Sequence, residues 1–184
     1  MVLTIQKPSF WKPDREIRDQ GRPYDVLDGR DPKKLAAILS ASQTISDGWL
    51  IIDGGGNRPA FDAEIASAVD LCIFPFRPSH EDLDTVSMDL DRIPNALAWP
   101  AAWPTNVFAI PAAASFISRL SKKYPSRVIT KVIPFVNSAS DLLAETLDSP
   151  STPVRSLAKK VFSVMEQQHA RINVKSSVKR RATA

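Results

Sequence analysis

An apolar run that ends in a carboxylate and three glycines constrains the fold of this chain more than any other feature. The run Trp49–Ile52 has the length and composition of a strand buried on both faces of a sheet. Asp53 and the glycines follow it, and after one short helical segment a second apolar run, Leu71–Phe76, predicts another strand. The order strand, helix, strand predicts a βαβ unit. Asp53 then lies at the carboxyl edge of a parallel sheet, where open α/β sheets bind ligands.

The rest of the chain alternates between predicted strands and predicted helices. Asp31 followed by Pro32 predicts a helix start, and Ser79 with Asp82 predicts the N-terminal cap of another helix. Further strands are predicted at 2–5, 24–27, 96–101 and 128–135, and further helices at 33–42, 111–123 and from 152 onward. This alternation predicts an α/β fold with a mostly parallel sheet flanked by helices.

Length and composition predict one domain over residues 1–172, followed by a basic, disordered tail over residues 173–184. A chain of 184 residues can bury roughly 70% of the surface that its unfolded form exposes, enough for one sizeable core. No apolar run approaches the ~20 residues of a membrane span, and the N-terminus has no signal-peptide pattern. We therefore expect a cytoplasmic protein without membrane contact. The single cysteine, Cys72, lies in a predicted strand, which favours a small buried hydrophobic side chain over a nucleophile.

Positive charge is concentrated towards the C-terminus. From Arg155 onward the chain has eight Lys and Arg against one acidic residue, Glu166, although the net charge of the whole chain is only +4. The last four of these basic residues are Lys175, Lys179, Arg180 and Arg181. A basic helix with such an end is typical of proteins that contact nucleic-acid phosphates without reading base sequence. The same composition also fits a solvated helix face followed by a disordered end.

Several motifs, taken in order, resemble the ParA/MinD family of partition ATPases. Ile51-Ile52-Asp53 is similar to the family strand that ends in a carboxylate, and Pro75–Ser79 with Leu83-Asp84 is similar to the next strand and helix start. Thr130–Pro134 resembles the last core strand and its proline-containing turn. The resemblance extends from about Trp49 to Val154. It implies a P-loop NTPase-like fold, hydrolysis of ATP with Mg²⁺, and a role in partitioning plasmids or chromosomes, with possible association with the nucleoid.

The resemblance also implies a role for individual residues. Asp53 would be the catalytic carboxylate, which would hold Mg²⁺ through a bound water and help to order the attacking water. Pro134 would lie beside the nucleotide base. The switch loop that approaches the terminal phosphate would consist of Gly54, Gly55 and Gly56. The basic C-terminal residues would bind non-specific DNA, and a ParB-like protein would be the partner. The chain would form a homodimer only around a complete ATP site.

The phosphate-binding loop of that family has no counterpart in this sequence. The family loop reads K-G-G-x-G-K-T, and neither Gly-Lys-Thr nor Gly-Lys-Ser occurs in the 184 residues. The glycine triplet is followed by Asn57-Arg58-Pro59, with no lysine nearby. We therefore expect a ParA/MinD-like fold that lacks its first strand and phosphate loop, in a truncated or degenerate chain. We also expect the DNA upstream of Met1 to encode the lacking unit.

Three functions are compatible with these motifs. The first is a ParA-type partition ATPase. The second is a protein of the same fold that does not hydrolyse ATP and acts by binding a partner or DNA. The third is a Rossmann protein similar to the methyltransferases that use S-adenosylmethionine, in which Asp53 and the glycines would resemble a D-x-G-x-G loop. This third function is the weakest, because no acidic residue ends the strand Leu71–Phe76 to hold ribose hydroxyls.

Overall fold

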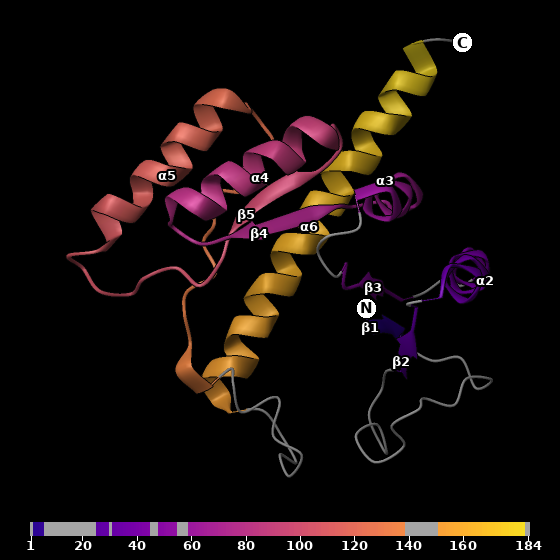
Figure 1. Cartoon of the computed structure of the whole chain (residues 1–184), viewed down its shortest axis with the longest axis horizontal. Coiled ribbons are helices and arrows are strands. Elements are labelled where there is room, and N and C mark those ends of the chain that lie inside the picture. The colour runs from indigo at the N-terminus through magenta and orange to yellow at the C-terminus, as the bar shows by residue number, and fades with distance from the viewer. Residues whose placement is uncertain are drawn as a thin grey trace. The chain divides into compact units, whose positions relative to one another are not determined.

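The computed structural model describes residues 2–5, 25–29, 31–44, 48–54, 59–138 and 151–182 of this α/β protein. Its elements in chain order are β1 (Val2–Ile5), β2 (Asp25–Asp28), α2 (Pro32–Ser42), β3 (Leu50–Ile52), α3 (Pro59–Ala68), β4 (Ile73–Phe76), α4 (His80–Arg92), β5 (Leu97–Pro100), α5 (Ile110–Lys123) and α6 (Thr152–Ala182) (Figure 1). The chain divides into two compact units, residues 1–64 and residues 65–184.

The first unit contains a three-stranded antiparallel sheet in the order β2–β1–β3. Leu3 of β1 lies opposite Leu27 of β2 on one side and opposite Ile52 of β3 on the other. The prediction of a mostly parallel sheet is therefore wrong for these strands, and β3 pairs with β1 rather than with β4 among the described residues. Burial of β3 on both faces is also wrong, because Ile51 is 48% exposed. An antiparallel sheet needs only one buried face, so an apolar run alone does not specify a parallel neighbour.

Two helices begin where the sequence predicts, because their caps are local. The Asp31 side chain accepts a hydrogen bond from the backbone N–H of Lys33 at 2.9 Å, and Pro32 is the first residue of α2. The Ser79 hydroxyl accepts one from the backbone N–H of Asp82 at 3.1 Å at the start of α4. Each cap satisfies a backbone donor that has no partner inside its helix.

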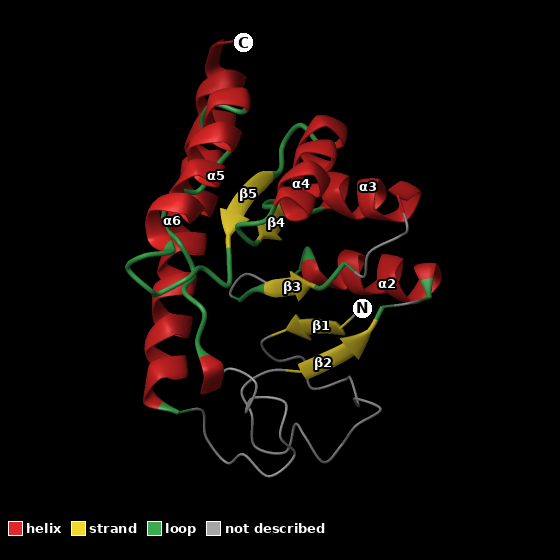
Figure 2. Cartoon of the chain, turned by 60° about the vertical axis from the view of Figure 1, so that its left-hand side comes forward, coloured by secondary structure: helices red, strands yellow, loops and turns green. Residues whose placement is uncertain are grey.

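The second unit is built on a small parallel sheet of β4 and β5 with helices on both faces (Figures 1 and 2). Phe76 and Ala98 lie on the face that packs against α4 and α5. Trp99 lies on the opposite face and packs against Val164 of α6. Successive side chains of a strand point to opposite faces, so each strand contributes to both helical layers. The parallel, helix-flanked sheet that the sequence predicts is confirmed for this unit.

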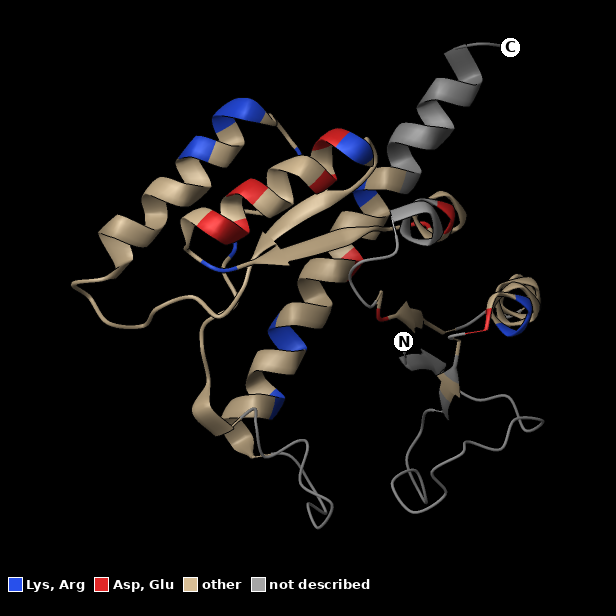
Figure 3. Ribbon diagram, in the orientation of Figure 1, with Lys and Arg blue, Asp and Glu red and all other residues tan. Residues whose placement is uncertain are grey.

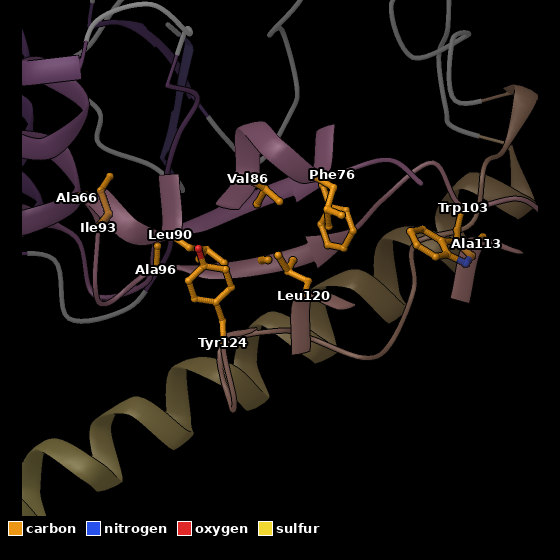
Figure 4. Close-up of a cluster of buried hydrophobic side chains, with 12 residues drawn as sticks. Ala66, Phe76, Val86, Leu90, Ile93, Ala96, Trp103, Ala113, Leu120 and Tyr124 are labelled. Atoms are coloured by element: carbon orange, nitrogen blue, oxygen red, sulfur yellow. The ribbon is translucent and has the colours of Figure 1, made fainter. Parts of the chain in front are cut away.

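The larger core lies between this sheet and the helices α4 and α5 (Figure 4). Leu90 of α4 is 0% exposed and Leu120 of α5 is 2% exposed. The rings of Phe76 and Trp103 meet edge to face with their centroids 6.0 Å apart. These contacts fix the carboxyl ends of both strands against the helical layer.

The segment 128–135 runs parallel to β5 but is not the continuous strand that the sequence predicts. Two isolated bridges join it to β5 and the residues that follow β5: Ala98 to Val128 and Trp103 to Pro134. Prolines interrupt the ladder, because Pro100 and Pro134 have no N–H group to donate. The carbonyl of Pro100 still accepts a hydrogen bond from Ile133 N at 2.8 Å.

Helix α6 continues to Ala182, through most of the segment 173–184 that the sequence assigns to a disordered tail. No glycine or proline follows Pro153, so no strong helix breaker ends it. Among the described residues, no helix has the length and apolar character needed to cross a membrane. Folding of residues 1–172 as one domain stays a prediction.

Candidate functional site

The residues predicted to hold a nucleotide lie in separate units. Asp53 and Gly54 follow β3 in the first unit, and both are exposed. Gly55 and Gly56 lie outside the described residues. Pro134 is half-buried in the second unit. The described residues contain no group of three His, Cys, Asp or Glu side chains that could hold a metal ion. The roles of these residues towards ATP and Mg²⁺ stay predictions.

Pro134 instead lines a groove of about 810 Å³ between the segment 131–136 and the first half of α6. Valine, isoleucine, leucine and proline side chains form most of its walls. Among the residues that the structure describes, three lysines also line it and no acidic residue does: Lys131, Lys159 and Lys160. An apolar groove with ammonium groups at its edge is suited to an anionic ligand.

Trp99 fixes the strand side of this groove. Its side chain is 4% exposed and packs against Ile129 and Val164. Its indole Nε1 donates a hydrogen bond to the carbonyl of Lys131 at 2.6 Å, which ties the start of the segment 131–136 to β5. The side chain of Lys131 then reaches α6, where Nζ donates to Oε1 of Gln167 at 3.3 Å. The groove therefore has two walls that are held together by apolar packing and by hydrogen bonds.

The groove lysines are not neutralised within the described part of the chain. Ion pairs in that part of the chain lie elsewhere: Arg77 with Asp82, Arg92 with Asp89, and Lys123 with Asp91. Lys159 and Lys160 are exposed on α6, and Figure 3 shows blue ribbon on the N-terminal half of that helix, whereas α4 carries several red segments. Positive groups without carboxylates beside them create a local positive potential that attracts polyanions.

The sequence of α6 continues to be basic beyond the groove. Positions 171, 175 and 179 follow one another at intervals of four along the helix, which places them along one side of it. At 1.5 Å per residue a helix of 31 residues is about 46 Å long. The predicted DNA-binding residues lie on its last turns, where the backbone alone is described: Lys175, Lys179, Arg180 and Arg181.

In the sequence, Lys159 and Lys160 stand out only as members of the basic end, and Lys131 only as part of the Thr130–Pro134 motif. The groove depends on contact between segments that lie about 30 residues apart, which no local pattern encodes. The available signal was the apolar stripe of α6, which includes Val161 and Met165 and which predicts a packed face.

Comparison with known proteins finds no match to this chain among family models, curated proteins or solved structures. The resemblance to the ParA/MinD family therefore rests on the sequence motifs alone.

Proposed function

We propose that this chain is a ParA-like protein that binds the phosphate backbone of DNA without sequence preference. One observation carries the proposal: among the described residues, three lysines and no carboxylate line the groove between the segment 131–136 and α6. Phosphate contacts provide affinity and position without reading bases, so they need clustered positive charge rather than a base-specific pattern. Helix α6 leads from this groove towards four more basic residues.

The motif resemblance gives this binding a biological context. The P-loop NTPase-like fold comes from this resemblance, and the small parallel sheet flanked by helices supports the α/β class alone. The protein would then act in the partition of plasmids or chromosomes, together with a ParB-like partner. Asp53 and the glycines after it would be the part of an ATP and Mg²⁺ site that this chain contains. Binding without hydrolysis is favoured for these 184 residues, because they include no glycine loop with a phosphate-binding lysine.

The test compares two triple variants that lose the same charge. The groove variant combines Lys131→Gln, Lys159→Gln and Lys160→Gln. The control combines three lysines that are exposed on other helices: Lys33→Gln and Lys34→Gln in α2, and Lys122→Gln in α5. Fluorescence anisotropy with a duplex of random sequence measures the dissociation constant at salt concentrations from about 50 to 200 mM.

The expected result is a change in salt dependence that is confined to the groove variant. Log affinity falls with log salt with a slope of about −0.9 per phosphate contact, so loss of three contacts should make the slope of the groove variant less negative by about 2.7. The control should keep the slope of the unaltered chain. Equal losses in both variants would show that net charge, rather than the groove, determines binding. An unchanged slope in the groove variant would refute the proposal for this site. Deletion of Lys175–Ala184 in the groove variant measures the separate contribution of the C-terminal end.

A further inference from the structure

A second surface, at the N-terminal end of α5, is apolar and carries both a projecting ring and a pocket. We propose that it joins two copies of this chain in a two-fold dimer, in which Phe108 of each copy enters an apolar pocket of the other. This dimer needs no nucleotide, unlike the ATP-dependent homodimer that the family resemblance implies. The pocket lies beside Phe108 within one copy, because Ala109 and Ala112 are among its lining residues. A two-fold axis next to this edge therefore generates both insertions at once, as a self-complementary interface requires.

The pocket has a volume of about 460 Å³ and lies beyond the carboxyl ends of β4 and β5. Alanines of the first turns of α5 leave the space open, and Phe116 and Phe135 form aromatic walls. A cavity of about 150 Å³ is large enough to hold benzene, so this pocket has room for a phenyl ring. None of the described side chains that line it is charged, which favours an apolar occupant over an ionic one.

Phe108 is held in solvent by a hydrogen-bonded turn. Its side chain is 89% exposed, the highest value among the large hydrophobic residues that the structure describes. Its backbone N–H donates to Oδ1 of Asn106 at 2.9 Å. The carbonyl of Asn106 accepts from Ala109 N at 3.0 Å and from Ile110 N at 3.2 Å. An aromatic ring on a fixed turn loses little conformational entropy when it is buried by a partner, so the turn is preorganised for binding.

The surface around the pocket is apolar as well. Val107 is 68% exposed, Ile110 is 41% exposed and Phe135 is 60% exposed. With Phe108 they make up four of the eight exposed large hydrophobic residues in the described part of the chain. Clustered apolar exposure of this kind marks interaction surfaces, whereas single exposed residues are ordinary. The same surface supplies both a projecting ring and a recess of matching chemistry, which is why the proposed partner is a second copy.

Backbone strain in the pocket wall is a separate observation. Ala102 has a φ of 49°, in the left-handed region that a Cβ atom disfavours. Hydrogen bonds on both sides hold this conformation, from Ala101 N to Phe76 O at 2.8 Å and from Trp103 N to Ile133 O at 2.9 Å. Strained residues of this kind concentrate where a binding surface is held in shape by its surroundings. The pocket is therefore formed before any partner arrives.

The dimer should be weak. Burial of a Phe side chain removes about 150–250 Å² from water, so the two aromatic and two aliphatic side chains of each copy bury roughly 400–600 Å². A standard interface buries about 800 Å² per partner, so we expect a dissociation constant on the order of 10 to 100 µM.

Sedimentation analysis tests this over chain concentrations that span the expected constant. Nuclease-treated protein is measured in about 1 M NaCl, where charge contacts are screened within about 3 Å and DNA bridging is suppressed. The unaltered chain should convert from monomer to dimer as its concentration rises. Phe108→Ser and Ala112→Glu should each raise the dissociation constant by about 30-fold or more, as expected for a central apolar contact. The control Met88→Ser, at a residue of α4 that is 72% exposed, should leave it unchanged.

Mixing the two variants tests the exchange of side chains directly. The Phe108→Ser chain keeps its pocket and the Ala112→Glu chain keeps its ring, so an equimolar mixture restores one of the two insertions. The mixture should associate more strongly than either variant alone. Each of three results would overturn the proposal: a monomeric unaltered chain at every concentration, dimerisation of Phe108→Ser like that of the unaltered chain, or a mixture that associates no better than its components. Open-ended oligomers would overturn the closed two-fold arrangement.

Discussion

Arg127 ties the C-terminal end of α4 to the sheet, and its replacement is a sharp test of how this unit is held together. Its guanidinium donates from Nη2 to the carbonyls of Leu90 at 2.9 Å and Ile93 at 2.7 Å, and from Nε to the carbonyl of Ala96 at 3.1 Å. Leu90 is in the last turn of the helix, where carbonyls have no partner inside the helix and the dipole is negative. Arg127→Met removes the charge and all three hydrogen bonds but keeps much of the aliphatic stem.

The size of the effect follows from these three bonds. A hydrogen bond to a charged group contributes about 1.5–3 kcal/mol, but bonds made by one group do not add fully. We therefore expect Arg127→Met to lower the free energy of unfolding by about 3 kcal/mol, and Arg127→Lys by about 2 kcal/mol, because an ammonium cannot reproduce the planar fork. The control is Arg92→Met, which removes one exposed contact with Asp89 at 3.2 Å and should lower the free energy of unfolding by less than about 0.5 kcal/mol.

Urea unfolding followed by tryptophan fluorescence measures the three variants beside the unaltered chain. For a chain of this length, about 3 kcal/mol corresponds to a fall in melting temperature of roughly 6–12 °C. The expectation is wrong if the free energies of unfolding of Arg127→Met and Arg92→Met differ by less than about 1 kcal/mol. The Arg127 guanidinium, with three carbonyl partners, would then contribute no more to stability than a surface residue.

Four further results are expected. The hydrogen bond from Arg77 is the main reason that the pKa of Asp82 is lowered, so the contribution of this carboxylate to stability is complete above its unfolded pKa of about 3.9 and is lost as the pH falls through the lower folded value. Asp82→Asn should therefore flatten part of the decline in melting temperature below about pH 4, and an unchanged decline would exclude this contribution. Leu90→Ala, at a side chain that is 0% exposed, should lower the free energy of unfolding by about 2–5 kcal/mol in urea, and a cost below 1 kcal/mol would mean that the core collapses around the site. Trp99→Phe removes the hydrogen bond to the Lys131 carbonyl and should weaken DNA binding in the anisotropy assay. Unchanged affinity would show that DNA binding does not depend on this hydrogen bond. Calorimetric titration with Mg-ATP should give a dissociation constant above about 1 mM for this 184-residue chain, and micromolar binding would reveal a phosphate site that the sequence does not show.

The helices of this protein could be predicted because their signals are local. The Asp31 and Ser79 caps act on backbone groups two or three residues away, so short motifs predicted the starts of α2 and α4. The apolar stripe of α6 follows the helical period, and it predicted the face that packs against the sheet. Each of these inferences needed only neighbours along the chain.

Strand partners and the candidate site could not be predicted in the same way, because both depend on distant residues. The apolar run that ends at Asp53 fits a parallel or an antiparallel neighbour, and the structure pairs it antiparallel with β1. Pro100 interrupts the hydrogen-bond ladder between β5 and the segment 128–135, which lies about 30 residues further along the chain. The groove brings Lys131 to Lys159 and Lys160 only because Trp99 and the apolar face of α6 pack together.

The most direct test of the proposed function is to find which lysines DNA covers. Acetylation by a lysine-reactive ester, read residue by residue with mass spectrometry, compares the free chain with the chain saturated by a duplex of random sequence. We expect strong protection at Lys131, Lys159 and Lys160, and unchanged reactivity at Lys33 and Lys34 of α2. Equal reactivity of the three groove lysines with and without saturating DNA would contradict the proposed function.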